Sequence, residues 1–318
     1  MRVIERDEVA RRLTYEVCIA IVRRAMIALS QGETRQLLRS IIPLARGHLF
    51  GIMPGALGED SAFGAKLVSV YPENSAKGRQ SHQGLVVLFD PETGEPVCVV
   101  HAGEITAIRT AAASAVATQV LARPDARRLA ILGYGEQAMT HARALLKVRA
   151  IQSVRVWGRS AEQAAAFCRR MQAELRIPFS CATEVEELVS DADIICTVTA
   201  AREPILKGAW VRPGTHLNLV GSSVAGPVEV DTHLVTRARF VADSRESVLR
   251  QGAEFLAAKA AGAIDDSHIV AEIGQVLSGD IVGRQSDADI TVYKSLGHVV
   301  QDLAAAWALY CGLPREGT

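Results

Sequence analysis

The sequence predicts an α/β protein: a Rossmann-type doubly wound parallel sheet domain plus an α+β domain. Three observations predict it. Strand and helix patterns alternate from residue 128 to residue 244, a glycine turn follows the first of these strands, and the N-terminal third mixes helix and strand patterns. Alternation of strands with helices is typical of a parallel sheet. A chain of 318 residues also suggests two domains.

The N-terminal third opens with a helix pattern and continues with strands. Apolar residues recur near helical spacing over 6–32 and stop at Gly32, which predicts one long amphipathic helix. Turn residues then separate short apolar runs, and 90–96, with the sequence DPETGEP, is typical of a hairpin loop. The predicted strands are 37–44, 48–55, 64–72, 84–90 and 95–102.

The remaining elements follow a helix of small residues at 104–123, which ends before Pro124. The final stretch, 291–313, has a helical pattern. We place the Rossmann domain at 116–291 and assign 1–115 plus 292–318 to the second domain. The strands predicted between these helices are 128–135, 153–159, 192–199, 215–222 and 239–244.

Composition excludes several classes of function. Thirty-five basic residues balance thirty-five acidic ones, so no net field favours nucleic acid or an anionic membrane as a partner. The charged N-terminus has no apolar signal segment, and the apolar runs are too short to span a bilayer, so we expect a cytoplasmic protein. The six cysteines form no C-x-x-C pair and the eight histidines are dispersed, which predicts free thiols and no metal site.

The glycine turn lies in the stretch LGYGEQA. Gly133 and Gly135 hold the first two places of a G-x-G-x-x-A pattern, and Ala138 holds the third. In this pattern the glycines permit a tight turn and let the backbone approach a pyrophosphate, which binds at the helix N-terminus. Because a strand precedes the turn and a helix follows it, we predict dinucleotide binding; the alternative is a tight turn that binds nothing.

The end of the second strand predicts which dinucleotide binds. An NAD site usually has an acidic residue there, whereas this sequence reads Gly158, Arg159 and Ser160. A guanidinium pairs with a 2′-phosphate and a hydroxyl donates to it, so we predict NADPH, with NADH as a weaker cofactor. The alternative is that Arg159 is an ordinary solvated arginine.

Three cations interrupt apolar segments. Lys66 lies in FGAKLVSVY, Arg109 in a helix of Ala, Thr, Ile and Val, and Arg39 in QLLRSIIPL. A buried cation needs an anion or water, although a single one is more often a side chain whose charged end reaches the surface. Three of them beside a predicted redox cofactor indicate a site that binds a carboxylate.

The chain resembles the ornithine cyclodeaminase/mu-crystallin family over nearly its whole length. The stretches that carry the resemblance are GIMPG, GAKLVSVYPEN, EITAIRTAAASAVAT, LGYGEQA, NLVGSS and DITVYKSLGHVVQD. The resemblance implies a Rossmann domain plus a substrate-binding domain that forms a homodimer, with the C-terminal helix returning to the substrate domain. The family contains cyclodeaminases, alanine dehydrogenases and ketimine reductases, and mu-crystallin, which binds NADPH and thyroid hormone.

The resemblance also implies roles for individual residues. Arg39, Lys66 and Arg109 fall on positions that bind the substrate carboxylate, and Lys66 also counts as catalytic. His82, in GRQSHQG, is a further catalytic candidate that has a surface histidine as its equal alternative. The implied cofactor-binding residues are Gly133, Gly135, Glu136, Gln137, Ala138, Arg159, Ser160, Thr197, Val198, Ser295 and Gly297.

One departure from the family pattern separates its activities. Cyclodeaminases and alanine dehydrogenases of this family carry an aspartate in VGxDxPG, whereas this chain reads VGSSVAGP with Ser223 at that place. A serine hydroxyl offers no carboxylate at pH 7. Ketimine reductases and mu-crystallin are similar in lacking the acid. Ser223 remains a catalytic candidate, because its hydroxyl could position a water molecule.

We therefore predict an NADPH-dependent reductase of a small cyclic imino acid. The expected substrates are Δ1-pyrroline-2-carboxylate and Δ1-piperideine-2-carboxylate, which give L-proline and L-pipecolate. Two alternatives stay open: a lyase of the ornithine cyclodeaminase or hydroxyproline dehydratase type, and a non-enzymatic NADPH-binding protein like mu-crystallin. The ring size depends on pocket volume, which the sequence does not fix.

Overall fold

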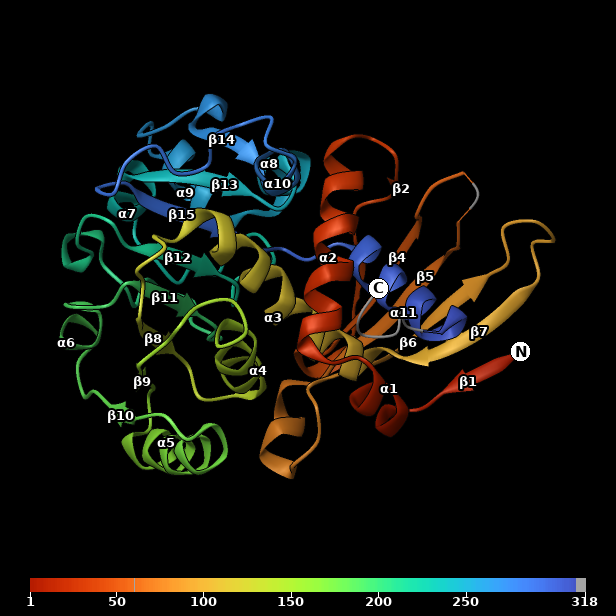
Figure 1. Ribbon diagram of the computed structural model, residues 1–318, viewed down its shortest axis with the longest axis horizontal. Helices are drawn as coiled ribbons and strands as arrows, with labels where there is room; N and C mark the ends of the chain where they lie inside the picture. Colours follow the sequence, from red (N-terminus) through yellow and green to blue (C-terminus); the bar gives the residue numbers. More distant parts are fainter. Residues whose placement is uncertain (60, 313–318) are drawn as a thin grey trace. The chain divides into compact units, whose positions relative to one another are not determined.

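The computed structural model describes residues 1–59 and 61–312, and the chain forms two compact units. The first combines Met1–Ala112 with the chain from His298 onward, and the second is Ala113–Gly297. Helix α3 (Ala102–Leu121) contributes to both units (Figure 1). The division falls at 112/113 and 297/298, where the sequence suggested 115/116 and 291/292.

The first unit contains a mixed seven-stranded sheet with the order β1-β7-β6-β5-β4-β2, and β3 also pairs with β4. Only the β1–β7 pair is parallel among these described pairs; the others are antiparallel. The strands are β1 (Arg2–Ile4), β2 (Arg35–Gln36), β3 (Ser40–Pro43), β4 (Leu49–Ala56), β5 (Phe63–Val70), β6 (His82–Phe89) and β7 (Pro96–His101).

Helices cover one face of this sheet. Helix α11 (Val299–Cys311) packs against β4, β5 and β6, and α2 (Tyr15–Ser30) packs against α11 (Figure 1). The prediction of one helix over 6–32 is wrong, because the chain forms α1 (Arg6–Arg12) and then α2. Thr14 lies between them in an extended conformation, and its hydroxyl accepts from the N–H of Val17, which caps α2. Short 3-10 helices η1 (Ala45–Gly47) and η2 (Pro72–Lys77) complete the described part of the unit.

The second unit is built on an eight-stranded sheet in which every pair is parallel. The order is β10-β9-β8-β11-β12-β15-β13-β14, so the connections reverse direction between β8 and β11. Such a switch point is where doubly wound sheets bind ligands, at the carboxyl ends of the strands. The strands are β8 (Arg128–Leu132), β9 (Ser153–Trp157), β10 (Phe179–Cys181), β11 (Ile194–Thr197), β12 (His216–Leu219), β13 (Ala238–Ala242), β14 (Ile269–Glu272) and β15 (Ile290–Lys294).

Strand β15 corrects the prediction of a helix over 291–313. Its residues are all buried and pair with β12 on one side and β13 on the other, and the helix begins only at Val299. A short run of apolar residues fits a buried strand as well as a helix, so the pattern alone could not decide. The short strands β10 and β14 were also not predicted.

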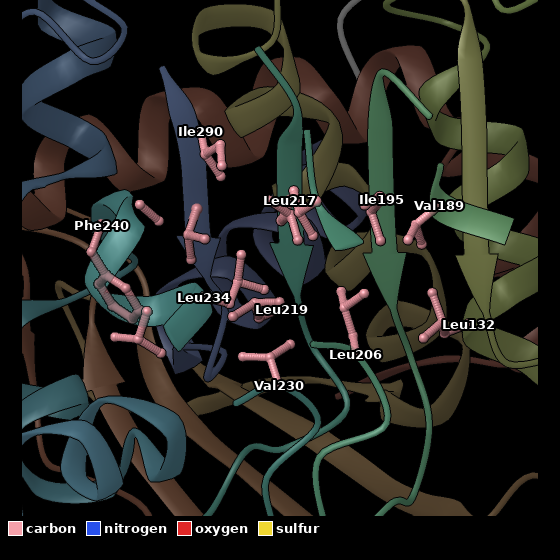
Figure 2. Packing of buried hydrophobic residues seen from close by; sticks show 14 of the residues in the cluster. Leu132, Val189, Ile195, Leu206, Leu217, Leu219, Val230, Leu234, Phe240 and Ile290 are labelled. Atoms are coloured by element: carbon pink, nitrogen blue, oxygen red, sulfur yellow. The ribbon is translucent and has the colours of Figure 1, made fainter. Parts of the chain in front are cut away.

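Both faces of the second sheet are covered, as a doubly wound fold requires. Leu217 and Leu219 of β12 point into an apolar cluster that also contains Leu234 of α7 and Phe240 of β13 (Figure 2). Asn218, between those two leucines, points the other way and donates to Thr118 of α3 at 3.0 Å. The helices of this unit besides α3 are α4 (Glu136–Leu145), α5 (Ala161–Leu175), α6 (Val185–Val189), η3 (Gly208–Trp210), α7 (Thr232–Arg237), α8 (Arg245–Gln251), α9 (Ala253–Ala260), η4 (Asp266–His268) and α10 (Ile273–Ser278).

Candidate active site

Two of the predicted cations meet at a buried carboxylate in the first unit. Lys66 projects from β5 toward α11, where its Nζ donates to Asp302 Oδ1 at 2.9 Å; the same Nζ donates to Thr106 Oγ1 of α3 at 2.6 Å. Arg109 of α3 donates from Nε to the same Oδ1 at 3.2 Å and from Nη1 to Gln301 Oε1 at 2.9 Å. One carboxylate oxygen therefore holds a lysine and an arginine together. We call Lys66, Arg109 and Asp302 the cation cluster.

The cation cluster is deeply buried and carries an excess of positive charge. The exposed fractions are 2% for Lys66, 4% for Arg109 and 0% for Asp302. Burial would raise the pKa of Asp302, but the positive charges of Arg109 and Lys66 outweigh it and hold that pKa below the usual value. Two cations thus face one anion in a region where unbalanced charge is unfavourable, and an anionic ligand would balance it.

Burial has a direct consequence for Lys66. Burial and the positive charges of Arg109 and Arg39 together lower the pKa of this lysine to about 8, against the opposing effect of Asp302. Lys66 therefore changes charge near neutral pH, which an exposed lysine does not do.

Arg39 and His82 belong to the same electrostatic neighbourhood. Arg39 is half-buried and directly precedes β3. His82, the first residue of β6, is exposed, and partial desolvation together with the positive charges of Lys66, Arg39 and Arg109 lowers its pKa. The four predicted residues are therefore close enough to influence one another electrostatically. One ring nitrogen of His82 lies 3.0 Å from Ser81 Oγ.

Sequence reasoning missed Asp302 and Gln301. Both are fully buried in an otherwise apolar part of α11, where they receive hydrogen bonds from the cations. A signal was present: the sequence VVQDLAAAW places two polar residues inside an apolar helix, and buried cations require such partners.

The glycine turn in the second unit has room for a phosphate group. Gly133 has φ = +124°, and a Cβ there would lie 2.9 Å from the carbonyl oxygen of Val198, so this position requires glycine. At Gly135, which precedes α4, a Cβ would meet nothing within 4 Å. The space beside Gly135 and the N–H groups of the first turn of α4 therefore fit a pyrophosphate. Ala138 is fully buried, as the third position of the pattern needs.

The predicted ribose-recognition residues follow β9. Arg159 is exposed, and the Ser160 hydroxyl caps α5 by accepting from the N–H of Gln163 at 3.2 Å, which leaves its own proton to donate. At Gly158 a Cβ would lie 2.1 Å from Cδ1 of Tyr134, so a larger residue there would require the Tyr134 ring to move. The exposed guanidinium and the hydroxyl fit a 2′-phosphate.

The other predicted cofactor residues differ in whether their polar groups are already hydrogen-bonded within the protein. Val198 lies against Gly133, but Thr197 is fully buried and its hydroxyl donates to Glu229 Oε2 at 2.7 Å, so that hydroxyl is already engaged. Ser295 has an exposed fraction of 2% and a buried Oγ that has no hydrogen-bond partner among the described residues. Gly297 has φ = +81° and donates its N–H to Asp243 Oδ2 at 2.8 Å.

A second buried charged group lies at the carboxyl ends of the strands of the second unit. Lys294 pairs with Glu254 at 2.7 Å, and the side chains of both are fully buried. The adjacent Glu229 accepts from Thr197 and from the backbone and side chain of Thr199. Burial raises the pKa of Glu229 despite these hydrogen bonds. We call Glu229, Glu254 and Lys294 the carboxylate cluster; sequence reasoning did not find it.

The carboxylate cluster also anchors the loop that carries Ser223. Nζ of Lys294 donates to the carbonyl oxygen of Ser222 at 2.5 Å, and the N–H of Gly221 donates to Glu229 Oε2 at 2.9 Å. The hydroxyl of Ser222 donates to the carbonyl oxygen of Pro227, which closes the loop. Ser223 itself is half-buried.

Over 1–59 and 61–312 no helix is long and apolar enough to cross a membrane. Within the same ranges, no group of three or more His, Cys, Asp or Glu side chains is arranged to hold a metal ion.

A dinucleotide-type turn in one unit and a buried cation cluster in the other are features of nicotinamide-dependent oxidoreductases that act on carboxylate substrates. Comparisons with known proteins identify the family. The sequence model of the ornithine cyclodeaminase/mu-crystallin family matches residues 2–313.

Two curated relatives and one solved structure show the extent of the similarity. Ketimine reductase mu-crystallin of Mus musculus is 39% identical over 280 residues, which cover 88% of this chain and 85% of the relative. A Δ1-pyrroline-2-carboxylate reductase of Bacillus cereus (strain ZK / E33L) is 36% identical over 312 residues, covering 98% and 96%. The structure of Thermococcus litoralis Δ1-pyrroline-2-carboxylate reductase in complex with NADH and L-proline has a TM-score of 0.94, 35% identity and coverage of 98% and 96%.

The chain belongs to the ornithine cyclodeaminase/mu-crystallin family, as its motifs predicted. The prediction of an NAD(P)H-dependent imine reductase is confirmed at the level of enzyme class, because these relatives are named as reductases of this kind.

Proposed function

We propose that this protein reduces Δ1-pyrroline-2-carboxylate, Δ1-piperideine-2-carboxylate or both, using NADPH, and that the products are L-proline and L-pipecolate. The observation that carries the proposal is the cation cluster, in which Lys66 and Arg109 share one oxygen of Asp302 and leave a positive charge unbalanced. A substrate carboxylate next to the C=N bond would supply the missing negative charge. The named activities of the relatives support the same substrate class.

The first unit supplies the groups that bind and orient the substrate. Arg109 and Lys66 would make charge-assisted hydrogen bonds to its carboxylate, and the positive charge of Arg39 would add to the attraction. Holding the carboxylate fixes the neighbouring imine carbon, which is the carbon that must accept a hydride. His82 would position a water molecule that protonates the ring nitrogen, and Ser223, which belongs to the second unit, is the second candidate for that role.

The second unit supplies the cofactor site. Bound NADPH would deliver the hydride, held at the turn formed by Gly133 and Gly135 and at the start of α4. The preference for NADPH rests on Arg159 and Ser160, which stand where an NAD site has an acidic residue. The Thermococcus litoralis relative was solved with NADH, so the preference is proposed for this chain on its own residues.

The test is a matched comparison of initial rates. The five-membered and six-membered ketimines are each supplied with NADPH and with NADH, and kcat/KM is measured for all four combinations. We expect turnover of at least one ketimine and a higher kcat/KM with NADPH. Tight NADPH binding without turnover of either ketimine would instead favour a binding protein.

We also propose a homodimer formed through the face of the first sheet opposite α11. Since Lys66 points toward α11, the alternation along β5 and its partners places Leu67, Leu85 and Ile52 on the other face, where they lie side by side on three strands. Leu85 is 46% exposed, Phe63 38% and Ile42 54%, which is typical of an association surface. Light scattering of native protein and of Leu85→Lys tests this: we expect a dimer for the first and a monomer for the second.

A further inference from the structure

Two cysteine thiols lie in direct contact at the edge of the second sheet. Sγ of Cys181, the last residue of β10, is 3.0 Å from Sγ of Cys168, which lies on the inner face of α5. Both cysteines are free thiols. The two residues are 13 positions apart in the sequence, so contact between them is a property of the fold.

The local structure holds the two thiols together. β10 pairs in parallel with β9, where Cys181 lies opposite Val156. The side-chain oxygen of Gln172 on α5 accepts from the N–H of Phe179 at 3.1 Å, which ties the helix to the start of β10. Strand and helix therefore fix the backbone positions of both cysteines, and a shift of about 1 Å between the sulfur atoms would bring them to the length of a disulfide bond.

The two thiols differ in solvent exposure, as a peroxide-reactive pair requires. Cys181 is exposed, whereas Cys168 has an exposed fraction of 5%. Burial and the neighbouring Cys181 raise the pKa of Cys168. An oxidant from solvent therefore reaches Cys181 first, and Cys168 is placed to react with the product.

We propose that Cys181 and Cys168 form a reversible oxidation site whose reactant is a hydroperoxide. The Cys181 thiolate attacks one peroxide oxygen, the O–O bond breaks, and the other oxygen leaves as water or alcohol after taking a proton; Cys181 becomes a sulfenic acid. Cys168 then attacks the Cys181 sulfur, the S–O bond breaks, and the hydroxide leaves as water with the Cys168 proton. The two sulfur atoms together lose two electrons, which reduce the peroxide, and the product is the Cys168–Cys181 disulfide.

The remaining cysteines provide matched controls. Cys18, Cys98 and Cys196 are buried, and Cys311 is exposed like Cys181. Cys311→Ser therefore tests whether exposure alone explains the reactivity, and Cys168→Ala tests whether the second thiol is needed.

The experiment treats the reduced protein with a small molar excess of hydrogen peroxide and then alkylates the remaining thiols. Peptide mapping by mass spectrometry locates any link, and dithiothreitol tests its reversal. We expect a Cys168–Cys181 link in the native protein and in Cys311→Ser, and loss of the link with dithiothreitol. We expect Cys168→Ala to accumulate a sulfenic acid at Cys181 that dimedone traps. The proposal is overturned if the native protein keeps both thiols alkylatable, or if Cys181 reaches the sulfinic acid without a link to Cys168.

Discussion

Each unit of this protein buries a cluster of charged side chains, and the two clusters have opposite charge balance. The cation cluster has two positive groups, Lys66 and Arg109, on one carboxylate. The carboxylate cluster has one positive group, Lys294, with two carboxylates, and one of these, Glu229, accepts hydrogen bonds from hydroxyl and backbone donors around it. The first cluster therefore carries an excess of positive charge, whereas the second has an excess carboxylate that protein donors stabilise.

The difference between the two clusters separates a binding site from a structural network. Burial and proximity of charges are common to both clusters, so neither property identifies function. What differs is the sign of the excess charge, and that protein donors already stabilise the excess carboxylate, Glu229. We therefore expect substitutions in the cation cluster to change catalysis, and substitutions in the carboxylate cluster to change stability.

The largest effect should come from removing a cation that binds substrate. We expect Lys66→Met to lower kcat/KM for the ketimine by at least ~10²-fold, because charge-assisted hydrogen bonds to a desolvated carboxylate are each worth ~1.5–3 kcal/mol. Asp302 keeps its contact with Arg109, so the fold should persist. Steady-state kinetics give the loss, and NADPH titration should show nearly unchanged affinity. Near-native turnover would mean that the carboxylate binds elsewhere.

The matched substitution in the other unit is Lys294→Met. It leaves Glu254 and Glu229 buried without a cation, and breaking a buried ion pair typically costs ~3–5 kcal/mol. We therefore expect Lys294→Met to lower the free energy of unfolding by that amount, measured by urea denaturation. Lys66→Met should lower the free energy of unfolding much less. Equal destabilisation by both substitutions would remove the distinction between the clusters.

The next effect concerns pH. Since kcat/KM reports the free enzyme, it should fall as pH rises through about 8, where Lys66 loses the proton that makes it a cation. Asp302→Asn removes the negative charge that supports protonated Lys66, so the fall should move to lower pH, and kcat/KM at pH 7.5 should drop by roughly 10-fold. Asp302→Glu should restore the native profile. An unchanged pH profile in Asp302→Asn would show that Lys66 does not control it.

Most helices and strands of the two units could be predicted from the sequence, but the elements whose hydrophobic pattern is ambiguous could not. Helix α3 and strands β8, β9, β11, β12 and β13 were predicted because strand and helix periods alternate cleanly there. Strand β15 was predicted as helix, because five buried residues lie next to a true helix and share its apolar character. The break between α1 and α2 was missed, because Thr14 caps a helix inside a continuous apolar pattern.

The site was predictable in one respect and not in another. Arg39, Lys66 and Arg109 stand out as cations among apolar residues, and the structure brings their charges together. Their partner Asp302 lies 193 residues from Arg109, so only the fold shows which carboxylate they share. Glu229 and Glu254 gave no signal, since single acidic residues near turns are normally solvated.

A smaller effect is expected from changing cofactor recognition. Arg159→Asp replaces the proposed partner of the 2′-phosphate with a repelling carboxylate, so kcat/KM with NADPH should fall by roughly 10-fold while NADH improves or is unchanged. Arg159→Gln, which removes the charge without reversing it, should give an intermediate result. Equal use of both cofactors by the native enzyme would contradict the assignment.

The smallest effect should come from Ser223, on the loop that the carboxylate cluster anchors. A cyclodeaminase removes hydride from ornithine, loses ammonia as the ring closes and returns the hydride, which makes repeated use of a general base. A carboxylate serves that purpose, whereas a serine hydroxyl does not unless a histidine activates it. A reductase needs only the hydride transfer and a proton that water can supply. We therefore expect Ser223→Ala to keep kcat/KM for ketimine reduction within about 10-fold of native, below the ~10²-fold that a general acid typically contributes.

The native protein should release no ammonia from L-ornithine with NAD⁺, and Ser223→Asp alone should not create efficient release, because Arg159 and Ser160 remain unsuited to NAD⁺. Ammonia production by the native protein at a rate near its ketimine reduction would assign the lyase activity instead, and would show that the missing aspartate does not distinguish the two chemistries.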